Sequence, residues 1–438
     1  MIIKGIMNKT RYIAGKKTYF VTDGASEHSF HWNEHIAYGA GIVIDGEVSG
    51  TRLDAKSVII LSEEDTKKLH VEIEAKIRED IDKCPSPIME DKLILELWPR
   101  IKETAIKLRC GKLFGRALLL RFHGDADGIA GAFAITEIMR CKALQQNSAV
   151  YSIRDALKDI ELVGQENMPL VLLVDFGSNK PSQEALKLLK AAGMEYVVID
   201  HHPYDGTAPE NTLSPFLVSE DASKYTAGYL CCEIARLCGM EKERALELTR
   251  IAFAGDKSKL LPLDTGDRKK ALVLDFLSAH ISFGNNLDFY KNVMSKSELF
   301  TSIATQADET IEEAAKKALS NSKEHEKGDL KVVTFSLENI AKKGEWPPSS
   351  KITTRIFERF MDGKPVVCIG YTDRSIIMRI NDSAAEKGLG ANKIAAKVLE
   401  TMGDFVEGGG GHVKAGAIRV KPGFVKEVLS EILRIIEN

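Results

Sequence analysis

Between Arg116 and about Leu277, short apolar runs alternate with stretches whose apolar residues recur at helical spacing. The apolar runs are RALLLRF, PLVLLVDF and EYVVID, and we expect helices near residues 129–145, 181–192 and 225–238. Short buried strands separated by helices are typical of a parallel α/β sheet. Such a sheet binds its ligands beyond the carboxyl ends of its strands. The residues that follow each apolar run are therefore the first candidates for a functional site.

Aspartates stand at or just after the end of each of these three apolar runs. The residues concerned are Asp125 and Asp127 after the first run, Asp175 after the second, and Asp200, His201 and His202 after the third. A single aspartate after a strand commonly caps the next helix or begins a turn. Together, however, these carboxylates would converge on one edge of the sheet, where their mutual repulsion is severe unless cations neutralise them.

The residue types at these strand ends indicate which cations would fit. Carboxylate and imidazole ligands without thiolate suit Mn²⁺ or Mg²⁺ better than structural zinc, and histidine favours Mn²⁺. Several bridging carboxylates can hold two ions ~3.5–4 Å apart, an arrangement that activates water and stabilises displacement at phosphorus. The paired aspartates of HGDADG are therefore interpreted as metal ligands on a tight turn, with small residues from Gly128 to Ala132 so that the next helix begins close beneath them.

Length and composition restrict the remaining possibilities. A chain of 438 residues is long enough for two or three domains. A net charge of −3 gives no overall attraction to polyanions, so nucleic acid would have to bind at local basic patches. The seven cysteines form no C-x-x-C pair, which argues against a disulfide framework and a thiolate zinc site. No apolar run approaches the ~18 residues of a membrane span, so we expect a cytoplasmic protein that does not enter a membrane.

The sequence pattern predicts an α/β protein with this order of parts: a small β-rich N-terminal domain (1–61), a helical connector interrupted at CPSP (62–110), a catalytic domain with the parallel sheet (111–286), a helical linker (287–327) and a smaller α/β domain (328–438). The last part combines apolar strands with helices expected at 391–402 and 423–436. A run of glycines, Gly408 to Gly411, precedes His412 there. It is either a flexible loop or a place where backbone N–H groups approach a phosphate.

At these motifs the sequence resembles a known family. HGDADG, VDFGSN and IDHHPYD are similar to the first three motifs of the DHH phosphoesterase superfamily, and GGGGHVKAGA resembles the signature of the DHH-associated C-terminal domain. The resemblance covers about residues 116–438 and is greatest to archaeal RecJ-like single-strand exonucleases. It implies a catalytic domain and a substrate-binding domain that face each other across a cleft.

The resemblance also implies a role for each matching residue. The implied ligands of two Mn²⁺ ions, or of Mg²⁺, are His123, Asp125, Asp127, Asp175, His201 and Asp256. Asp200 would support this cluster and His202 would face the substrate phosphate. The implied substrate-binding residues are Arg379, Gly409, Gly410, Gly411 and His412. In bacterial RecJ-type sequences the acid corresponding to Asp256 stands three residues later, where this chain has Lys259.

The N-terminal region carries basic and aromatic residues. The first twenty residues contain Lys4, Lys9, Arg11, Lys16 and Lys17 and no acid, which is typical of a solvated strand face or of a nucleic-acid-facing edge. Tyr19, Phe20, Phe30 and Trp32 are interpreted as core residues of the β domain, with base stacking as the alternative. The three histidines of HSFHWNEH lack the further ligands of a metal site. Residues 1–110 are expected to extend a binding surface.

The expected function is that of a metal-dependent exonuclease that degrades single-stranded DNA or RNA to nucleoside 5′-monophosphates by a two-metal mechanism. One alternative is a phosphodiesterase for oligoribonucleotides or cyclic dinucleotides. Another is a noncatalytic replication or repair scaffold, because the superfamily includes relatives that have lost their metal ligands. This chain keeps the acids and histidines of the motifs, which favours an enzyme, although a replication or repair partner is compatible with catalysis.

Overall fold

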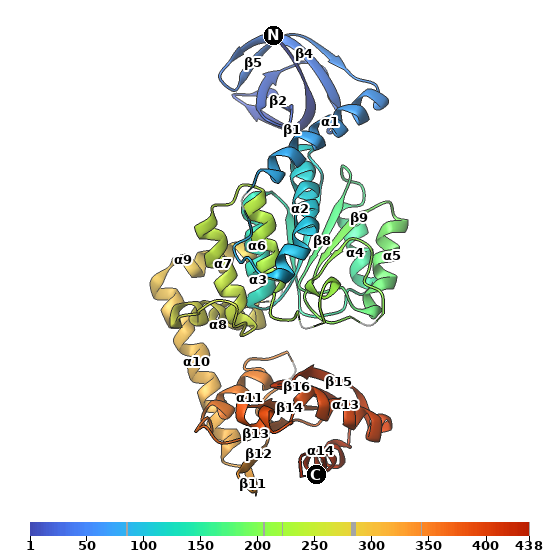
Figure 1. Cartoon of the computed structure of the whole chain (residues 1–438). Coiled ribbons are helices and arrows are strands. Elements are labelled where there is room, and N and C mark those ends of the chain that lie inside the picture. Colours follow the sequence, from blue (N-terminus) through green and yellow to red (C-terminus); the bar gives the residue numbers. More distant parts are fainter. Residues whose placement is uncertain (85, 205, 221, 282–285, 343, 438) are drawn as a thin grey trace. The chain divides into compact units, whose positions relative to one another are not determined.

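The computed structural model of the chain describes residues 1–84, 86–204, 206–220, 222–281, 286–342 and 344–437. The chain divides into two compact units, Met1–Met294 and Ser295–Asn438 (Figure 1). Both units are built from sheets and helices, which confirms the predicted α/β class. Within the described ranges, no helix is long and apolar enough to cross a membrane.

The first unit begins with a closed barrel in the strand order β1-β2-β3-β5-β4 (Figure 1). Its strands are β1 (Ile2–Ile13), β2 (Lys16–Thr22), β3 (Glu27–His31), β4 (Gly41–Ser49) and β5 (Arg52–Ile60). The neighbours are antiparallel, as the sequence predicts, except where β3 meets β5 in a parallel pair of Ser29 with Arg52. That pair closes the sheet on itself and removes its free edges.

Two helices follow the barrel, as predicted. Ser62 is the N-cap of helix α1 (Glu63–Asp82), and Asp91 is the N-cap of α2 (Lys92–Leu113). The side chain of each cap accepts a hydrogen bond from a backbone N–H of the first turn. The interruption expected at CPSP falls between the two helices, although its Pro85 lies outside the described residues. The helical connector therefore comprises two helices that pack on each other.

The centre of the first unit is a parallel sheet in the order β10-β9-β8-β6-β7. Its strands are β6 (Leu118–His123), β7 (Lys142–Gln146), β8 (Leu170–Val174), β9 (Glu195–Ile199) and β10 (Thr212–Leu213). Helices α4 (Ile153–Val163) and α5 (Gln183–Ala191) lie on one side of the sheet, and α3 (Ala126–Ile138) and α6 (Ala227–Leu237) on the other (Figure 1). Helices α7 (Lys242–Gly255) and α8 (Thr265–His280) pack against α3.

One expectation about this sheet is wrong. The helix expected near 129–145 ends at Ile138, and residues 142–146 form strand β7 instead. Strand β7 pairs with β6 from Leu119 to His123. Its sequence, KALQQ, has no run of apolar residues that would mark it as a strand. Backbone hydrogen bonds with β6 determine that these residues form a strand, so the local sequence does not predict β7.

A second expectation fails at the end of the linker. Helices α9 (Asn286–Ser295) and α10 (Ser297–Leu319) occupy most of the region expected to be helical, but Lys323–Lys327 form strand β11. This strand consists of exposed charged residues and pairs with β12 (Leu330–Ser336) through a tight turn in which Gly328 has a φ of +61°. Because β11 is an edge strand, its charges remain in solvent and give no apolar periodicity.

The second unit contains a mixed sheet in the order β11-β12-β13-β14-β16-β15. Its other strands are β13 (Val366–Tyr371), β14 (Ser375–Ile380), β15 (Val406–His412) and β16 (Ala415–Val420). Helices α13 (Ala391–Met402) and α14 (Val425–Glu437) pack on one face, and α11 (Ser349–Glu358) packs with α10 on the other. The remaining elements are α12 (Asp382–Glu386) and the 3-10 helices Lys180–Ser182, Pro215–Leu217 and Gly403–Phe405.

Candidate metal centre

The acids of the first three motifs lie at one edge of the parallel sheet. Strand β6 ends at His123, β8 ends one residue before Asp175, and β9 ends one residue before Asp200. These three strands are neighbours and run in the same direction, so their carboxyl ends coincide. A Cβ on Gly128 would lie 2.4 Å from the carbonyl oxygen of His123, which explains why a glycine follows the paired aspartates.

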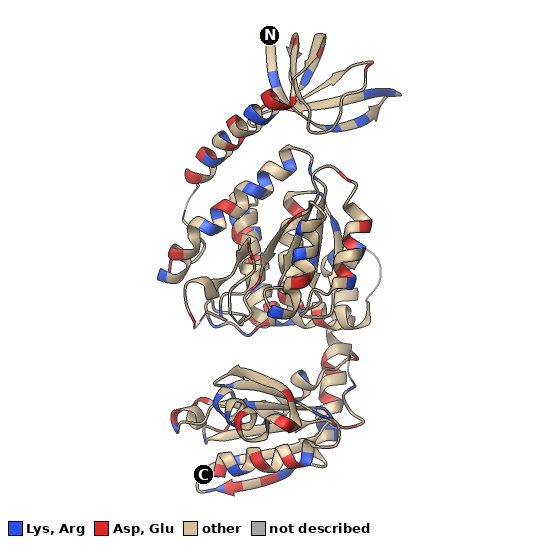
Figure 2. Cartoon of the chain, turned by 90° about the vertical axis from the view of Figure 1, so that its right-hand side faces the viewer, with Lys and Arg blue, Asp and Glu red and all other residues tan. Residues whose placement is uncertain are grey.

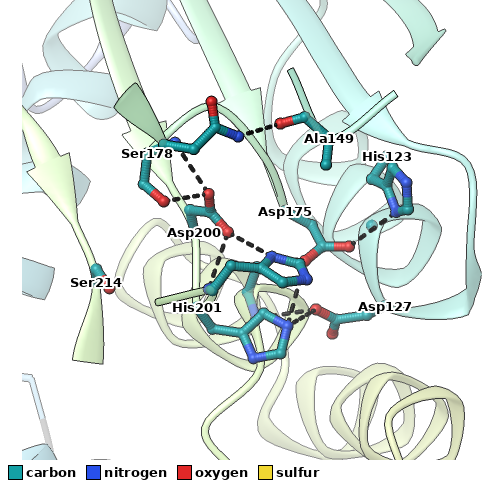
Figure 3. A network of polar contacts seen from close by, with 12 residues as sticks. His123, Asp127, Ala149, Asp175, Ser178, Asp200, His201 and Ser214 are labelled. Atoms are coloured by element: carbon teal, nitrogen blue, oxygen red, sulfur yellow. Dashed lines mark hydrogen bonds and ion pairs between the residues drawn. The ribbon is translucent and has the colours of Figure 1, made fainter. Parts of the chain in front are cut away.

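The side chains from these ends point toward one another (Figure 3). His123 Nδ1 lies 2.7 Å from Asp125 Oδ2 and 3.4 Å from Asp175 Oδ2. His201 Nε2 lies 3.3 Å from Asp175 Oδ1 and 2.9 Å from Asp256 Oδ2. Residues separated by more than 130 positions in the sequence thus meet within the reach of a metal ion.

Among the described residues, donor atoms within 4.8 Å of one another form three groups. The groups are His123, Asp125 and Asp175; Asp127, His201 and Asp256; and Asp175, His201 and His202. Asp175 and His201 each belong to two groups, so the donor atoms overlap like those of a site that shares ligands between two cations. Every residue that the sequence implied as a metal ligand lies in at least one group.

Asp175 has the features expected of a shared ligand. Its φ is +68°, a conformation that a residue other than glycine rarely adopts and that costs roughly 1–3 kcal/mol. Its side chain is only 1% exposed. Within the described part of the chain, its Oδ1 is buried and accepts no hydrogen bond, although His201 Nε2 is close. A buried carboxylate oxygen without a donor is costly, and a cation would satisfy it.

His201 is held in the tautomer that a metal requires. Its Nδ1 lies 3.1 Å from the carbonyl oxygen of Ser223, and because a carbonyl only accepts, Nδ1 carries the proton. In the neutral ring, Nε2 then presents a lone pair to the oxygens of Asp175 and Asp256. Such an arrangement repels unless a proton or a metal cation lies between the groups, and a second hydrogen bond of this kind is typical of metal-ligating histidines.

The electrostatics of the cluster agree with this geometry. Burial, followed by the negative charges of Asp175 and Asp256, raises the pKa of Asp127 well above its usual value. Burial, followed by the charge of Asp125, likewise raises the pKa of Asp175. Burial disfavours the charged form of His201, but Asp256 and Asp175 outweigh it and raise the pKa of the ring. Without metal, the cluster therefore retains protons that a divalent cation would replace.

Asp200 differs from the other acids because its oxygens are already engaged. Oδ2 accepts hydrogen bonds from the backbone N–H (3.0 Å) and the hydroxyl (2.6 Å) of Ser178, and Oδ1 lies 2.9 Å from His202 Nδ1 (Figure 3). Asp200 belongs to none of the donor groups formed by the described residues. Its contact orients the His202 ring, which is half exposed, and leaves His202 Nε2 for another partner.

Asp256, which the sequence motif left open against position 259, lies in the cluster. It is the C-cap of α7, and its Oδ2 reaches His201. Lys257, the next residue, has a φ of +57° and turns the chain away immediately after it. The aspartate directly after the glycine, rather than the residue three positions later, is therefore the one that meets His201.

The structure adds supporting contacts that the sequence did not indicate. Asp127 accepts hydrogen bonds from the backbone N–H groups of Ala227 (2.9 Å) and Gly228 (3.0 Å) at the start of α6. Asp275, in the middle of α8, accepts one from the backbone N–H of Ala126 at 2.8 Å. The helix start at Thr226 was detectable as a capping residue before an apolar stretch, whereas nothing in the sequence around Asp275 marks its contact with Ala126.

Among the residues implied to bind substrate, Arg379 and His412 lie on one face of the sheet in the second unit. Arg379 on β14, Ala415 on β16 and His412 on β15 form a cross-strand row, and directly opposed residues point to the same side. Arg379 is held by Thr354 Oγ1 (3.1 Å) and the carbonyl oxygen of Met378 (3.0 Å), while His412 is exposed. Burial lowers the pKa of Arg379.

The glycine run is an edge strand rather than a loop. Gly409, Gly410 and Gly411 pair with β16, and β15 has its other side unpaired in the described sheet. A Cβ on Gly411, whose φ is +140°, would lie 2.3 Å from the carbonyl oxygen of Ala415, so the sheet itself requires a glycine there. A Cβ on Gly410 would have no neighbour within 4 Å. Of Gly409, Gly410 and Gly411, Gly410 is therefore the one that packing does not require.

Comparisons with known proteins support the fold. Residues 119–254 match the family model described as the DHH family, N-terminal domain, so this part of the chain carries a DHH domain. An uncharacterized protein of Methanocaldococcus jannaschii is 26% identical over 444 aligned residues, which cover 84% of this chain and 58% of the relative. The chain thus spans less than two thirds of that relative.

Solved structures extend this similarity to the fold. The DHH domain of a member of a family of ribosomal proteins superposes with a TM-score of 0.74 and 25% identity, covering 86% of this chain and 99% of its own. RecJ of Thermus thermophilus, in complex with Mn²⁺, has a TM-score of 0.50 and 15% identity, covering 83% of this chain and 59% of its own. The chain therefore has a DHH phosphoesterase fold with a His/Asp cluster suited to metal.

Proposed function

We propose that the protein is a metal-dependent phosphodiesterase that acts as an exonuclease on single-stranded DNA or RNA and releases nucleoside 5′-monophosphates. The observation that carries the proposal is the overlap of donor groups at Asp175 and His201, together with the unpartnered Oδ1 of Asp175. Carboxylate and imidazole donors favour Mn²⁺, with Mg²⁺ as the alternative. When bound, two such ions polarise a phosphodiester and activate water.

The residues of the cluster have distinct roles in this proposal. His123 and Asp125 would hold one ion and Asp127 and Asp256 the other, and Asp175 would contribute to both. Asp200 is a positioning residue, because it fixes the His202 ring through a 2.9 Å contact. With Nδ1 engaged there, His202 Nε2 donates to a phosphate oxygen of the substrate when the ring is protonated. The pKa of His202 is raised, since Asp200 and Asp175 outweigh the opposing effect of burial, and this favours the protonated form.

Residues of the second unit hold the substrate phosphate in this proposal. Arg379 and His412 point to the same side of the sheet, and Gly410 lies one row away, opposite Ala417 and on the level of Ile377. Small residues on this exposed part of the sheet allow a phosphate to reach the Arg379 guanidinium, whose fork suits two phosphate oxygens. Arg419, exposed on β16 with its side chain on the same side as Ala415, adds a cation that the motifs did not indicate.

One comparison supports a nucleic acid substrate, and a second supports the fold. One similar solved structure belongs by name to a family of ribosomal proteins, which associates it with an RNA-containing particle. RecJ of Thermus thermophilus shares the fold and holds Mn²⁺.

The test uses end-labelled single-stranded DNA and RNA of several lengths, incubated with Mn²⁺ and separated on a denaturing gel. We expect a ladder of labelled products that shortens one nucleotide at a time when cleavage starts at the unlabelled end, and a labelled mononucleotide when it starts at the labelled end. Cleavage confined to the shortest RNAs or to cyclic dinucleotides would favour the small-substrate phosphodiesterase. No hydrolysis of any substrate in Mn²⁺ or Mg²⁺ would contradict the proposal and favour a scaffold.

A further inference from the structure

The N-terminal barrel has an outer face whose composition differs from the rest of its surface. Tyr19 on β2 and Phe30 on β3 lie in the barrel core and stack at 5.7 Å. Because successive side chains of a strand point to opposite sides, Phe20 and its cross-strand neighbour Ser29 lie outside. A bulge at position 8 of β1 places Lys9 opposite Phe20.

We call this surface the β1–β3 face and define it by two cross-strand rows, Lys9, Phe20 and Ser29, and Arg11, Thr18 and His31. Lys9 Nζ lies 4.6 Å from the centre of the Phe20 ring. Arg11 is exposed, Thr18 is buried, and the other four residues are half-buried; Thr18 Oγ1 lies 3.1 Å from His31 Nδ1. On the outside of the barrel, the half-buried Phe20 ring thus lies beside Lys9, with Arg11 in the adjacent row. Glu27 approaches it, 3.9 Å from Lys9.

The outer surface of β4 and β5 provides the contrast. It carries Asp45, Glu47 and Asp54, and its cations are already paired: Lys56 with Glu47 at 2.6 Å and Arg52 with Asp54 at 3.4 Å. Figure 2 shows both signs of charge on the barrel strands. The two surfaces belong to the same small domain, so their difference is not an effect of overall composition. A polyanion would be attracted to the β1–β3 face and not to the β4–β5 surface.

We propose that the β1–β3 face binds single-stranded nucleic acid, with a base stacked on Phe20 and backbone phosphates on Lys9 and Arg11. This inference rests on the proposed nucleic acid substrate and adds a second contact region to it. Closed five-stranded barrels often bind oligonucleotides on the face that contains the second and third strands. An aromatic ring flanked by cations is the combination that binds a strand without regard to sequence.

Binding is measured on the full chain in EDTA, so that hydrolysis plays no part. The probes are fluorescein-labelled oligo(dT) and oligo(U) of about 20 nucleotides, longer than the roughly 4–16 that one such barrel covers. The readout is fluorescence anisotropy over a series of salt concentrations. The variants are Phe20→Ala, Phe20→Tyr and the double change Lys9→Ala with Arg11→Ala. The matched control is Lys56→Ala, which removes a cation from the β4–β5 surface.

We expect Phe20→Ala to weaken binding about 5- to 100-fold and Phe20→Tyr to restore most of it, since the tyrosine ring also stacks. The Lys9 and Arg11 double variant should reduce the salt slope by about 1.4, or ~0.7 for each lost phosphate contact. The control should leave affinity and slope unchanged. Circular dichroism identifies any variant that has unfolded, and the charge variants, which lie at the surface, test the proposal independently of Phe20.

A small chromogenic phosphodiester without a nucleobase separates this inference from the proposed function. The variants of the β1–β3 face should hydrolyse it in Mn²⁺ as the parent protein does. If the parent binds the oligonucleotides but hydrolyses no substrate, the proposed function fails and the inference holds. If the parent does not bind them, or if all variants bind equally well, the inference is overturned and the face is better explained as a protein contact.

Discussion

The parallel sheet of the first unit and the mixed sheet of the second present their polar residues in opposite ways. In the parallel sheet, the aspartates and histidines gather at the strand ends and are largely buried. In the mixed sheet, Arg379 and His412 lie along a cross-strand row on a face, next to glycines and alanines that leave it open. Strand ends can bring several carboxylates to one point, whereas a face spreads residues at strand spacing. The first arrangement suits metal ions and the second an extended anion.

The largest effect should follow from Asp175→Asn in the metal cluster. This change removes the carboxylate that two donor groups share. Mn²⁺-dependent hydrolysis should fall by at least about 100-fold, because even residues behind the ligands typically cost 10–100-fold. Initial rates on a labelled single strand measure this. Asp82→Asn, which changes an exposed aspartate of α1, is the control and should retain the parent rate.

The same variant also tests the repulsion within the cluster. Without metal, its melting temperature should equal or exceed that of the parent, since an unpartnered buried carboxylate has been removed. In the parent, free Mn²⁺ at 100 times its Kd should add about 2.7 kcal/mol to the free energy of unfolding, and Asp175→Asn should gain less. Near-parental turnover of Asp175→Asn in saturating Mn²⁺ would exclude a shared carboxylate.

The glycine run of the mixed sheet allows a paired test. Gly411→Ala would place a Cβ 2.3 Å from a backbone oxygen of β16, so we expect it to lower the free energy of unfolding by roughly 1–3 kcal/mol. Gly410→Ala meets no neighbour and should leave stability unchanged while it weakens substrate binding. Urea unfolding and KM measurements distinguish the two. Equal loss of stability in both variants would show that the whole run has a structural role.

A smaller effect is expected from Arg379→Ala. Activity should fall about tenfold, the equivalent of a lost charged hydrogen bond of ~1.4 kcal/mol. Mn²⁺ binding, measured by calorimetry, should not change, because Arg379 belongs to none of the donor groups that the described residues form. Arg374→Ala, in the exposed turn before β14, is the control. Loss of Mn²⁺ binding in Arg379→Ala would contradict the hypothesis that the parallel sheet binds metal and the mixed sheet binds substrate.

The smallest effect concerns pH. Burial and the charges of Asp175 and Asp256 raise the pKa of Asp127 in the folded protein. A carboxyl whose pKa is higher in the folded than in the unfolded state keeps its proton longer when folded. Its contribution to the free energy of unfolding therefore falls as the pH rises from about 4 through the folded pKa, by about 1.4 kcal/mol for every tenfold gain in proton affinity on folding.

Urea unfolding of the metal-free protein between pH 4 and 8 checks this prediction. Asp127→Asn should lack part of the decline seen in the parent, whatever its absolute stability. The slopes are compared because an asparagine cannot accept hydrogen bonds from both Ala227 and Gly228 with the same geometry. Saturating Mn²⁺ should remove the decline from the parent. Identical slopes in the parent and Asp127→Asn would mean that Asp127 is ionised throughout this range.

Much of the metal cluster was predictable from sequence because its residues follow recognisable strands. An apolar run that ends in Asp175 or Asp200 places that residue at the carboxyl end of a parallel strand, and parallel neighbours bring these ends together. The barrel was predicted only as a small β unit. The barrel closes where β3 pairs with β5 at Ser29 and Arg52. The local sequence around these two residues does not predict that they pair.

The aromatic residues of the barrel show how far such reasoning extends. All four were interpreted as core residues, which is correct for Tyr19 and Phe30, and the partly buried Trp32 packs against the same cluster. Phe20 lies outside, because strand β2 alternates and Tyr19 already occupies the inner side. Sequence alone did not reveal the bulge in β1 that sets Lys9 opposite Phe20, since a bulge depends on the register of two strands.

The sequence by itself determined the α/β class, the strand-end acids and the nature of the ligands, because strand formation and side-chain chemistry are local properties. Tertiary structure alone decided that Asp256 reaches His201, that Asp275 holds the start of α3, and that residues 142–146 and 323–327 become edge strands. These features join segments far apart in the chain. They form only when the packing of distant surfaces outweighs the entropy lost on closing the loops between them. No short stretch of sequence contains the information on that packing.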